Sequence, residues 1–322
     1  MIGRRKFIIA SALVPARGLA QTQQAIWPSK PVRILVGFPP GQGSDVVARI
    51  VAEGLQKTFG IPFVIENRPG AGGLIAAGLA ARATPDGYTI LFTSSGPYTI
   101  SPHLYAKQPF DSMTDLAPVA LLGSSPTLLL SSPTFPLKTI PEIVKLSMTR
   151  ELDCGSSGHG ITDHLTLEML KIRSGARLRH VPYKGSTASL TDLVGGRIDL
   201  AFASSTSALS FVKTGRVEVL AQAGQQRWKP MPNVPAIADT YPGFLATSWA
   251  MMAVPAGTPD DVKKRLATAL DTNLSTPSVA EGLASSGLEA TPGNTPESAK
   301  AFAMAEYEKW GAVIRQANIR LE

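Results

Sequence analysis

Apolar residues along the chain follow two periodicities that alternate. Short, continuous apolar runs such as VRILVGF, residues 32–38, have the length and β-branched content of buried strands. Such a run is followed by a segment in which apolar residues recur every three or four positions, as they do over residues 45–59. This spacing is typical of helices with one buried face. Strands that alternate with helices predict parallel strands joined by crossover helices, and therefore an α/β fold.

The alternation occurs twice along the chain. The first part predicts strands over residues 32–38, 63–66 and 88–92, and helices over residues 45–59 and 70–83. The second part predicts strands over residues 151–154, 180–183, 198–203 and 217–222, and helices over residues 140–146, 163–172, 187–194 and 207–214. Two further helices, over residues 260–274 and 296–316, end the chain. We expect both of them to pack on the first part.

Two long apolar segments connect the two parts. Residues 117–130 and 247–254 each read as a strand that crosses from one part to the other. They divide the chain into a first lobe, residues 27–123 with 248–322, and a second lobe, residues 124–247. In open α/β sheets the ligand binds beyond the carboxyl ends of the strands. We therefore expect a ligand site in a cleft between the two lobes.

The N-terminus reads as an export signal. Arg4, Arg5 and Lys6 precede a short apolar run, and small residues at positions 18 and 20 suit cleavage after Ala20. The run is much shorter than the roughly 20 residues that a membrane span needs. The arginine pair also resembles a twin-arginine signal, so both export routes stay open. We predict that residues 1–20 are removed and that the mature protein is periplasmic.

Charge and cysteine content exclude several classes. The chain has 31 basic and 24 acidic residues, and four of the basic ones lie in residues 1–20, so the mature chain carries a net charge of only +3. This charge, without a basic cluster that includes aromatic residues, argues against a nucleic-acid partner. The single cysteine, Cys154, allows no internal disulfide and no cysteine-based zinc site.

The loop VGFPPGQGSD, residues 36–45, joins the first strand to the first helix. A dinucleotide fingerprint would need glycine where Val46 stands, and a phosphate loop would need lysine where Ser44 stands. Both nucleotide interpretations therefore fail. Free N–H groups at a helix start, with Ser44 or Asp45 as the cap, suit a ligand carboxylate. A capped turn that binds no ligand is the alternative.

The segment GSSGHGITDH, residues 155–164, repeats this pattern in the second lobe, with Thr162 as the expected cap. It is not a hydrolase elbow, because the closing glycine of G-x-S-x-G would be His159. His159 and His164 are five positions apart and share no helix face, and the sequence places no third ligand beside them. We therefore expect no metal site. Polar loop and cap groups without a ligand are again the alternative.

Several strings together carry a family resemblance. They are WPSKPVRILVGFPPG, SDVVAR, VIENRPGAGG, PDGYTILFTSS, HVPYKGS, LTDLVGGRIDL, AVPAGTP and KWGAVIRQANI. With them, residues 27–319 resemble the Bug-type extracytoplasmic solute receptors of tripartite tricarboxylate transporters. The resemblance implies a two-lobed periplasmic-binding-protein type II (Venus flytrap) fold, in which each lobe is a mixed sheet flanked by helices. It also implies no catalysis, no cofactor, and a ligand carboxylate held by loop backbone groups, often through water.

The same resemblance places the ligand loops. In the first lobe they fall on Pro39, Pro40, Gly41, Gln42, Ser44 and Asp45, and on Thr93, Ser94 and Ser95. In the second lobe they fall on Gly155, Ser156, Ser157, Gly158, His159 and His164, on Tyr183 and Lys184, and on Ala203 and Ser204. The chain departs from the family at three places, with Gln42 for Gly, His159 and Ile161 for Asn and Thr, and Ala203-Ser204 for Asp-Asn. These departures concern the choice of ligand and leave the fold as expected.

We therefore predict a monomeric periplasmic receptor that captures a small organic acid and delivers it to the membrane subunits of a tripartite tricarboxylate transporter. A ligand sensor for a two-component system would share every motif and stays open. A secreted serine hydrolase using Ser95 or Ser157 would need a neighbouring base and an orienting acid, and the sequence identifies neither. Since Ala203 replaces the usual acid, and Asp45 and Asp163 lie at helix starts, we expect a ligand without a charged amine.

Overall fold

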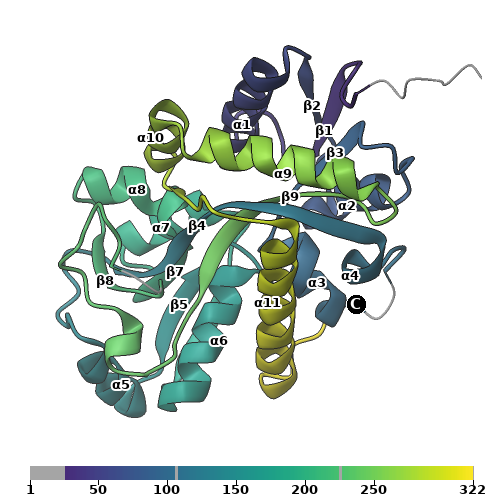
Figure 1. The fold of residues 1–322 in the computed structure, drawn as a ribbon. Helices are drawn as coiled ribbons and strands as arrows, with labels where there is room; N and C mark the ends of the chain where they lie inside the picture. Colours follow the sequence, from purple (N-terminus) through teal and green to yellow (C-terminus); the bar gives the residue numbers. More distant parts are fainter. Residues whose placement is uncertain (1–25, 106–107, 225–226, 322) are drawn as a thin grey trace, which may run out of the picture.

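The structure is a computed structural model that describes residues 26–105, 108–224 and 227–321. The predicted signal segment, residues 1–20, lies outside the described residues. Two α/β lobes lie side by side and share one continuous sheet (Figure 1). The described part of the chain contains no helix that is both long and apolar enough to cross a bilayer.

Ten strands form the sheet, in the order β2-β1-β3-β9-β4-β7-β5-β6, with β8 and β10 paired to β4. The strands of the first lobe are β1 (Val32–Val36), β2 (Phe63–Asn67), β3 (Thr89–Ser94) and β10 (Glu289–Ala290). Those of the second are β5 (Leu152–Ser156), β6 (Leu178–Pro182), β7 (Leu200–Ser204) and β8 (Glu218–Gln222). Within the lobes, β1 pairs in parallel with β2 and β3, and β5 pairs in parallel with β6 and β7. The predicted α/β class is confirmed.

The two predicted crossing strands are present as β4 (Leu116–Ser131) and β9 (Thr247–Pro255). They pair antiparallel from Leu116 opposite Pro255 to Pro126 opposite Thr247. From Thr127 onward β4 pairs instead with β7, starting opposite Ser204. The strand thus changes partner near residue 126 and passes from one lobe to the other. The lobe boundaries at residues 123/124 and 247/248 stay a prediction.

Helices cover both faces of the sheet, which explains why strands such as β1 are almost continuously apolar. On one face Ile34 and Val36 pack under helices α1 and α9, and on the other Leu35 packs against α2. The helices of the first lobe are α1 (Gly43–Phe59), α2 (Leu74–Ala81), α3 (Ser101–Leu104), α4 (Ser112–Asp115), α9 (Asp260–Leu274) and α10 (Pro277–Ser285). Those of the second are α5 (Ile140–Thr149), α6 (Thr162–Ser174), α7 (Ser186–Val194) and α8 (Ser205–Lys213).

The C-terminal helix α11 (Pro296–Gln316) runs alongside both lobes (Figure 1). Its start buries Ala299 and Ala303 in a cluster of the first lobe, whereas Trp310 near its end packs in the core of the second lobe. The expectation that this helix packs on the first lobe therefore holds for its start, whereas its end packs on the second lobe. Midway, the Glu306 carboxylate accepts hydrogen bonds from the indole N–H groups of Trp249, 3.1 Å away, and Trp310, 3.0 Å away. This carboxylate links the helix to the crossing strand β9.

Candidate ligand-binding cleft

A cavity of about 360 Å³ lies between the lobes, within the size range of small-molecule sites. Its polar lining consists largely of hydroxyl groups from both lobes and both crossing strands. The hydroxyl-bearing residues are Ser44, Ser94, Ser95, Ser125, Ser157, Thr162, Ser186, Ser204, Thr206, Ser207, Ser248 and Ser286. Apolar residues that include Phe38, Phe92 and Trp249 form the rest of the wall. The cavity therefore offers many hydrogen-bond donors between apolar surfaces.

Four helix N-termini meet at this cavity. Residues of their first turns line it: Gly43 and Ser44 of α1, Thr162 and Asp163 of α6, Ser186 of α7, and Thr206 and Ser207 of α8. The first N–H groups of a helix have no partner within the helix, and the helix dipole makes this end positive. Among the described lining residues none is a lysine or arginine. Positive potential in the cleft therefore comes from backbone groups.

The first predicted loop is held in place by Asp45. Its buried carboxylate accepts hydrogen bonds from the Gly41 N–H at 2.9 Å, from Arg49 Nε at 2.8 Å, and from Asn67 Nδ2 at 2.9 Å. Burial alone would raise the pKa of Asp45, but these bonds outweigh it and lower the pKa to about 2. The helix cap is Gln42, so the expectation that Ser44 or Asp45 caps α1 is wrong.

The second predicted loop, residues 93–95, lies at the end of β3. Ser94 and Ser95 line the cavity, whereas Thr93 is buried and does not. The Ser95 hydroxyl lies 2.8 Å from the Thr162 hydroxyl of the opposite lobe. Ser125, on the crossing strand β4, contributes a buried hydroxyl that has no hydrogen-bond partner among the described residues. A buried polar group of this kind is costly unless something bonds to it, so Ser125 is a candidate ligand contact.

The loop of the second lobe brings a carboxyl group into the cleft. Asp163 is buried and lines the cavity, and the Ser157 hydroxyl donates to its Oδ2 at 2.5 Å. Burial raises the pKa of Asp163 to about 6, although the hydroxyl and the N–H of Ser157 oppose the rise. Asp163 is the one ionisable side chain among the described lining residues. The expectation of an amine-free ligand assumed that Asp163 serves the start of α6, and the position of its carboxyl group in the cavity lining was not foreseen.

Ile161 is the N-cap of α6 and Thr162 is its first residue, so Thr162 is not the cap, although both residues line the cavity. Other predicted residues lie outside the cavity lining. Tyr183 donates its hydroxyl hydrogen to Asp192 at 3.0 Å, Lys184 is exposed, and Ala203 packs in the core of the second lobe. The remaining predicted residues that do not line the cavity are Pro39, Pro40, Gly41, Asp45, Thr93, Gly155, Ser156, Gly158, His159 and His164. Their contact with a ligand stays a prediction.

Six predicted residues do line the cavity: Gln42, Ser44, Ser94, Ser95, Ser157 and Ser204. Sequence reasoning missed others, above all Ser125, Ser248 and Trp249 on the crossing strands and Ser186 at the start of α7. Ser186 had a usable signal, because a strand and a glycine precede it as in the predicted loops. The crossing strands carried no such signal, since their serines lie within apolar runs.

Comparison with known proteins agrees with this arrangement. Residues 47–319 match the family described as tripartite tricarboxylate transporter family receptor. The chain belongs to this family. Over 324 residues it is 31% identical to protein BugT of Bordetella pertussis, covering 99% of this chain and 99% of that protein. The predicted recognition as a Bug-type receptor is confirmed.

Solved structures of receptors extend the comparison to the fold. An R. palustris protein solved with adipate is 31% identical and superposes with a TM-score of 0.81. The match covers 91% of this chain and 99% of that one. The periplasmic binding protein BugD is 30% identical, with a TM-score of 0.77 over 92% of this chain and 100% of that one. MatC of Rhodopseudomonas palustris, solved with malate, is 28% identical, with a TM-score of 0.76 over 89% of this chain and 100% of that one. The predicted two-lobed type II fold is confirmed.

The receptor is a binding protein, not an enzyme, in keeping with its family and structural relatives. The geometry agrees at both serines that the hydrolase alternative requires. Ser157 donates to Asp163, and Ser95 bonds to Thr162. Neither hydroxyl is paired with a histidine, which a serine nucleophile of the usual type needs as its base.

Proposed function

We propose that this chain captures a small organic carboxylate in the cleft between its lobes. The observation that carries the proposal is the meeting of the N-termini of α1, α6, α7 and α8 around a cavity lined with hydroxyl groups. Helix N-termini are ready-made anion sites, and hydroxyl groups add donors for carboxylate oxygens. Adipate and malate, found with two of the solved relatives, are both small organic carboxylates.

The apolar walls of the cavity favour an acid with an apolar middle part. Phe38 and Phe92 from the first lobe and Trp249 from β9 lie beside the hydroxyl groups. Such walls favour a carbon chain or ring between polar ends. Because the lining comes from both lobes, a ligand that contacts both stabilises the arrangement in which the lobes lie together.

The proposal extends to transport. The family description supports delivery of the bound acid to the membrane subunits of a tripartite tricarboxylate transporter. Export through the signal in residues 1–20 would place the receptor, as a monomer, in the periplasm. N-terminal sequencing of the exported protein should then start near Gln21. A protein that still begins at Met1 would contradict this part.

A thermal-shift screen tests the ligand class. Mature protein is heated with single organic acids and with the methyl ester of each acid. A ligand at a hundredfold excess over its Kd stabilises by about 2.7 kcal/mol. We expect a rise in Tm for at least one acid and a much smaller rise for its ester. An equal rise for acid and ester would overturn the proposal that backbone N–H groups bind a carboxylate.

A further inference from the structure

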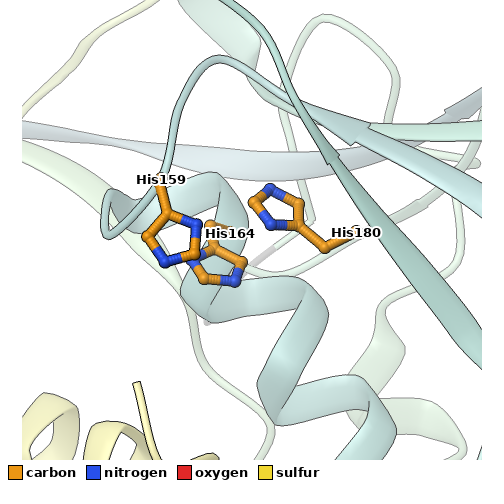
Figure 2. A group of neighbouring side chains, drawn as sticks. All are labelled: His159, His164 and His180. Carbon is orange, nitrogen blue, oxygen red and sulfur yellow. The ribbon is translucent and has the colours of Figure 1, made fainter. Parts of the chain in front are cut away.

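Three of the four histidines of the chain lie together near the start of α6. His159 comes from the loop before α6, His164 from the first turn of α6, and His180 from β6, and their rings face one another in Figure 2. One ring nitrogen from each lies within 4.8 Å of the other two. His180 lies on a separate strand, so its place in the sequence offers no reason to group it with the other two.

His180 is held with one nitrogen free. Its Nε2 lies 2.7 Å from the Ser156 hydroxyl, and that hydroxyl donates to the Gly158 carbonyl at 2.8 Å. Since the hydroxyl hydrogen is already used, Ser156 accepts from the Nε2–H of His180. The neutral ring therefore carries its lone pair on Nδ1. A fixed partner on one ring nitrogen is the arrangement that prepares the other nitrogen to bind a metal ion.

Both ring nitrogens of His164 have a neighbouring group. Its Nδ1 accepts a hydrogen bond from the Gly160 N–H at 3.0 Å, which leaves the ring proton on Nε2. The Glu168 carboxylate, one turn further along α6, lies 3.7 Å from that Nε2. A carboxylate beside the protonated nitrogen of a metal-binding histidine orients the ring and raises its basicity. A metal ion at Nδ1 would replace the hydrogen bond from Gly160.

We propose that His159, His164 and His180 bind one divalent late transition-metal ion of the Zn²⁺ or Cu²⁺ type. Imidazole ligands suit these ions, whereas Mg²⁺ and Ca²⁺ prefer oxygen ligands. Zn–N bonds of about 2.1 Å place tetrahedral ligand nitrogens about 3.4 Å apart, so the present spacing of at most 4.8 Å has to close by up to about 1.4 Å. The exposed His159, flanked by Gly158 and Gly160, makes most of that adjustment.

The rings also have to turn on binding. The rings of His164 and His180 are stacked, with centroids 3.8 Å apart and an interplanar angle of 13°. A shared ion must lie close to the plane of each ring, so the two planes have to open. The ring of His159, with its centroid 4.5 Å from that of His164, approaches from the loop side. Binding therefore requires rotation of the side chains that brings the three lone pairs to one point.

None of the three histidines lines the cavity, whereas Ser157, Thr162 and Asp163, from the same segment as His159 and His164, do. An ion that ties this segment to β6 would therefore fix the wall of the cleft. This role goes beyond ligand binding, because the site uses none of the lining residues.

Calorimetric titration of the mature protein without a histidine tag tests the site, with ZnCl₂, CuCl₂ and MgCl₂ as probes. We expect one Zn²⁺ or one Cu²⁺ per chain, tighter binding of Cu²⁺, and no binding of Mg²⁺. His159→Ala and His180→Gln should each weaken the affinity at least about tenfold. His103→Gln is the matched control, because the fourth histidine lies on α3 and bonds through Nε2 to the Tyr307 carbonyl.

A spectroscopic readout separates this site from scattered surface binding. The electron paramagnetic resonance spectrum of the one-to-one Cu²⁺ complex should show coupling to imidazole nitrogens, and His159→Ala should change it. His159 is exposed, so this variant keeps its fold even where His180→Gln loses it. The proposal is overturned when neither Zn²⁺ nor Cu²⁺ binds at one per chain. It is equally overturned when His159→Ala leaves both affinity and spectrum unchanged.

Discussion

The hydroxyl oxygens of Ser95 and Thr162 lie 2.8 Å apart and join the two lobes at the wall of the cleft. Ser95 directly follows β3 in the first lobe, and Thr162 is the first residue of α6 in the second. Both residues are buried and both line the cavity. The hydrogen bond therefore belongs at once to the ligand site and to the contact between lobes, and a ligand that touches either hydroxyl is coupled to the lobe arrangement.

A double-mutant cycle tests that coupling. Ser95→Ala and Thr162→Val each remove one partner, and each should lower the free energy of unfolding by about 1 kcal/mol. The free energy of unfolding of the double variant should fall by less than the sum of the two single losses. The second change removes a hydroxyl group whose partner is already gone. Urea denaturation of the mature protein measures all four states.

Thr166→Val is the control for this cycle. Thr166 is also buried on α6, but its hydroxyl donates to the Thr162 carbonyl within the same helix. Its effect should add to that of Ser95→Ala without coupling. Strict additivity of Ser95→Ala and Thr162→Val would show that the hydroxyl pair does not join the lobes.

Gly43→Ala tests whether the ligand approaches the start of α1. A Cβ atom at Gly43 would meet no protein atom within 4 Å, and the residue lines the cavity. The change should leave the free energy of unfolding unaltered while it lowers the affinity for the acid found in the screen at least about fivefold, a cost of about 1 kcal/mol. Gly195→Ala, at the end of α7 and away from the lining, should change neither quantity. Equal affinity of the Gly43→Ala variant and the original protein would show that the ligand does not approach this helix start.

The sequence predicted the parts of the fold that carry long, regular apolar patterns. The crossing strands β4 and β9 and the helix α9 were recognised because each buries an extended apolar run. The short helices α3 and α4 and the two-residue strand β10 were missed, since elements of this length show no periodicity. The position of α11 was only partly predicted. Periodicity reveals a buried face, but not that Ala299 and Trp310 would face the cores of different lobes.

The site was predictable where a residue ends a strand, as Ser94 does, or directly follows one, as Ser95 and Ser157 do. Such positions lie at the sheet edge that faces the cleft. Ser125 and Trp249 were not predictable, because the direction of a side chain on a crossing strand depends on the register between β4 and β9. Asp163 was noticed in the sequence, but only the packing shows that a carboxylate at a helix start also faces a cavity.

Asp45 should make stability depend on acid pH. Its hydrogen bonds lower the folded-state pKa from 3.8 to about 2, so the contribution of the ionised form is complete above the unfolded pKa and is lost as the pH falls toward 2. A shift of this size on a buried group corresponds to about 2 kcal/mol. Urea denaturation should show Asp45→Asn less stable than the original protein at pH 7, with a smaller difference at pH 3. A difference independent of pH between 7 and 3 would contradict the assignment.

The charge of Asp163 should decide between ligands with and without an amine. Its buried carboxyl group is the one ionisable side chain that the structure describes in the cavity lining, and the helix N-termini around it favour anions. An ammonium group on the ligand would pair with Asp163, and a charge-assisted hydrogen bond contributes about 1.5–3 kcal/mol. Asp163→Asn should therefore lower the affinity for an amino acid relative to its amine-free analogue by about tenfold.

Aspartate against malate is the first pair to titrate by calorimetry, followed by other amino acids against their deaminated analogues. Asp261→Asn, an exposed change of equal charge on α9, should leave each ratio unaltered. If Asp163→Asn also leaves the ratios unaltered, Asp163 does not take part in the choice of ligand.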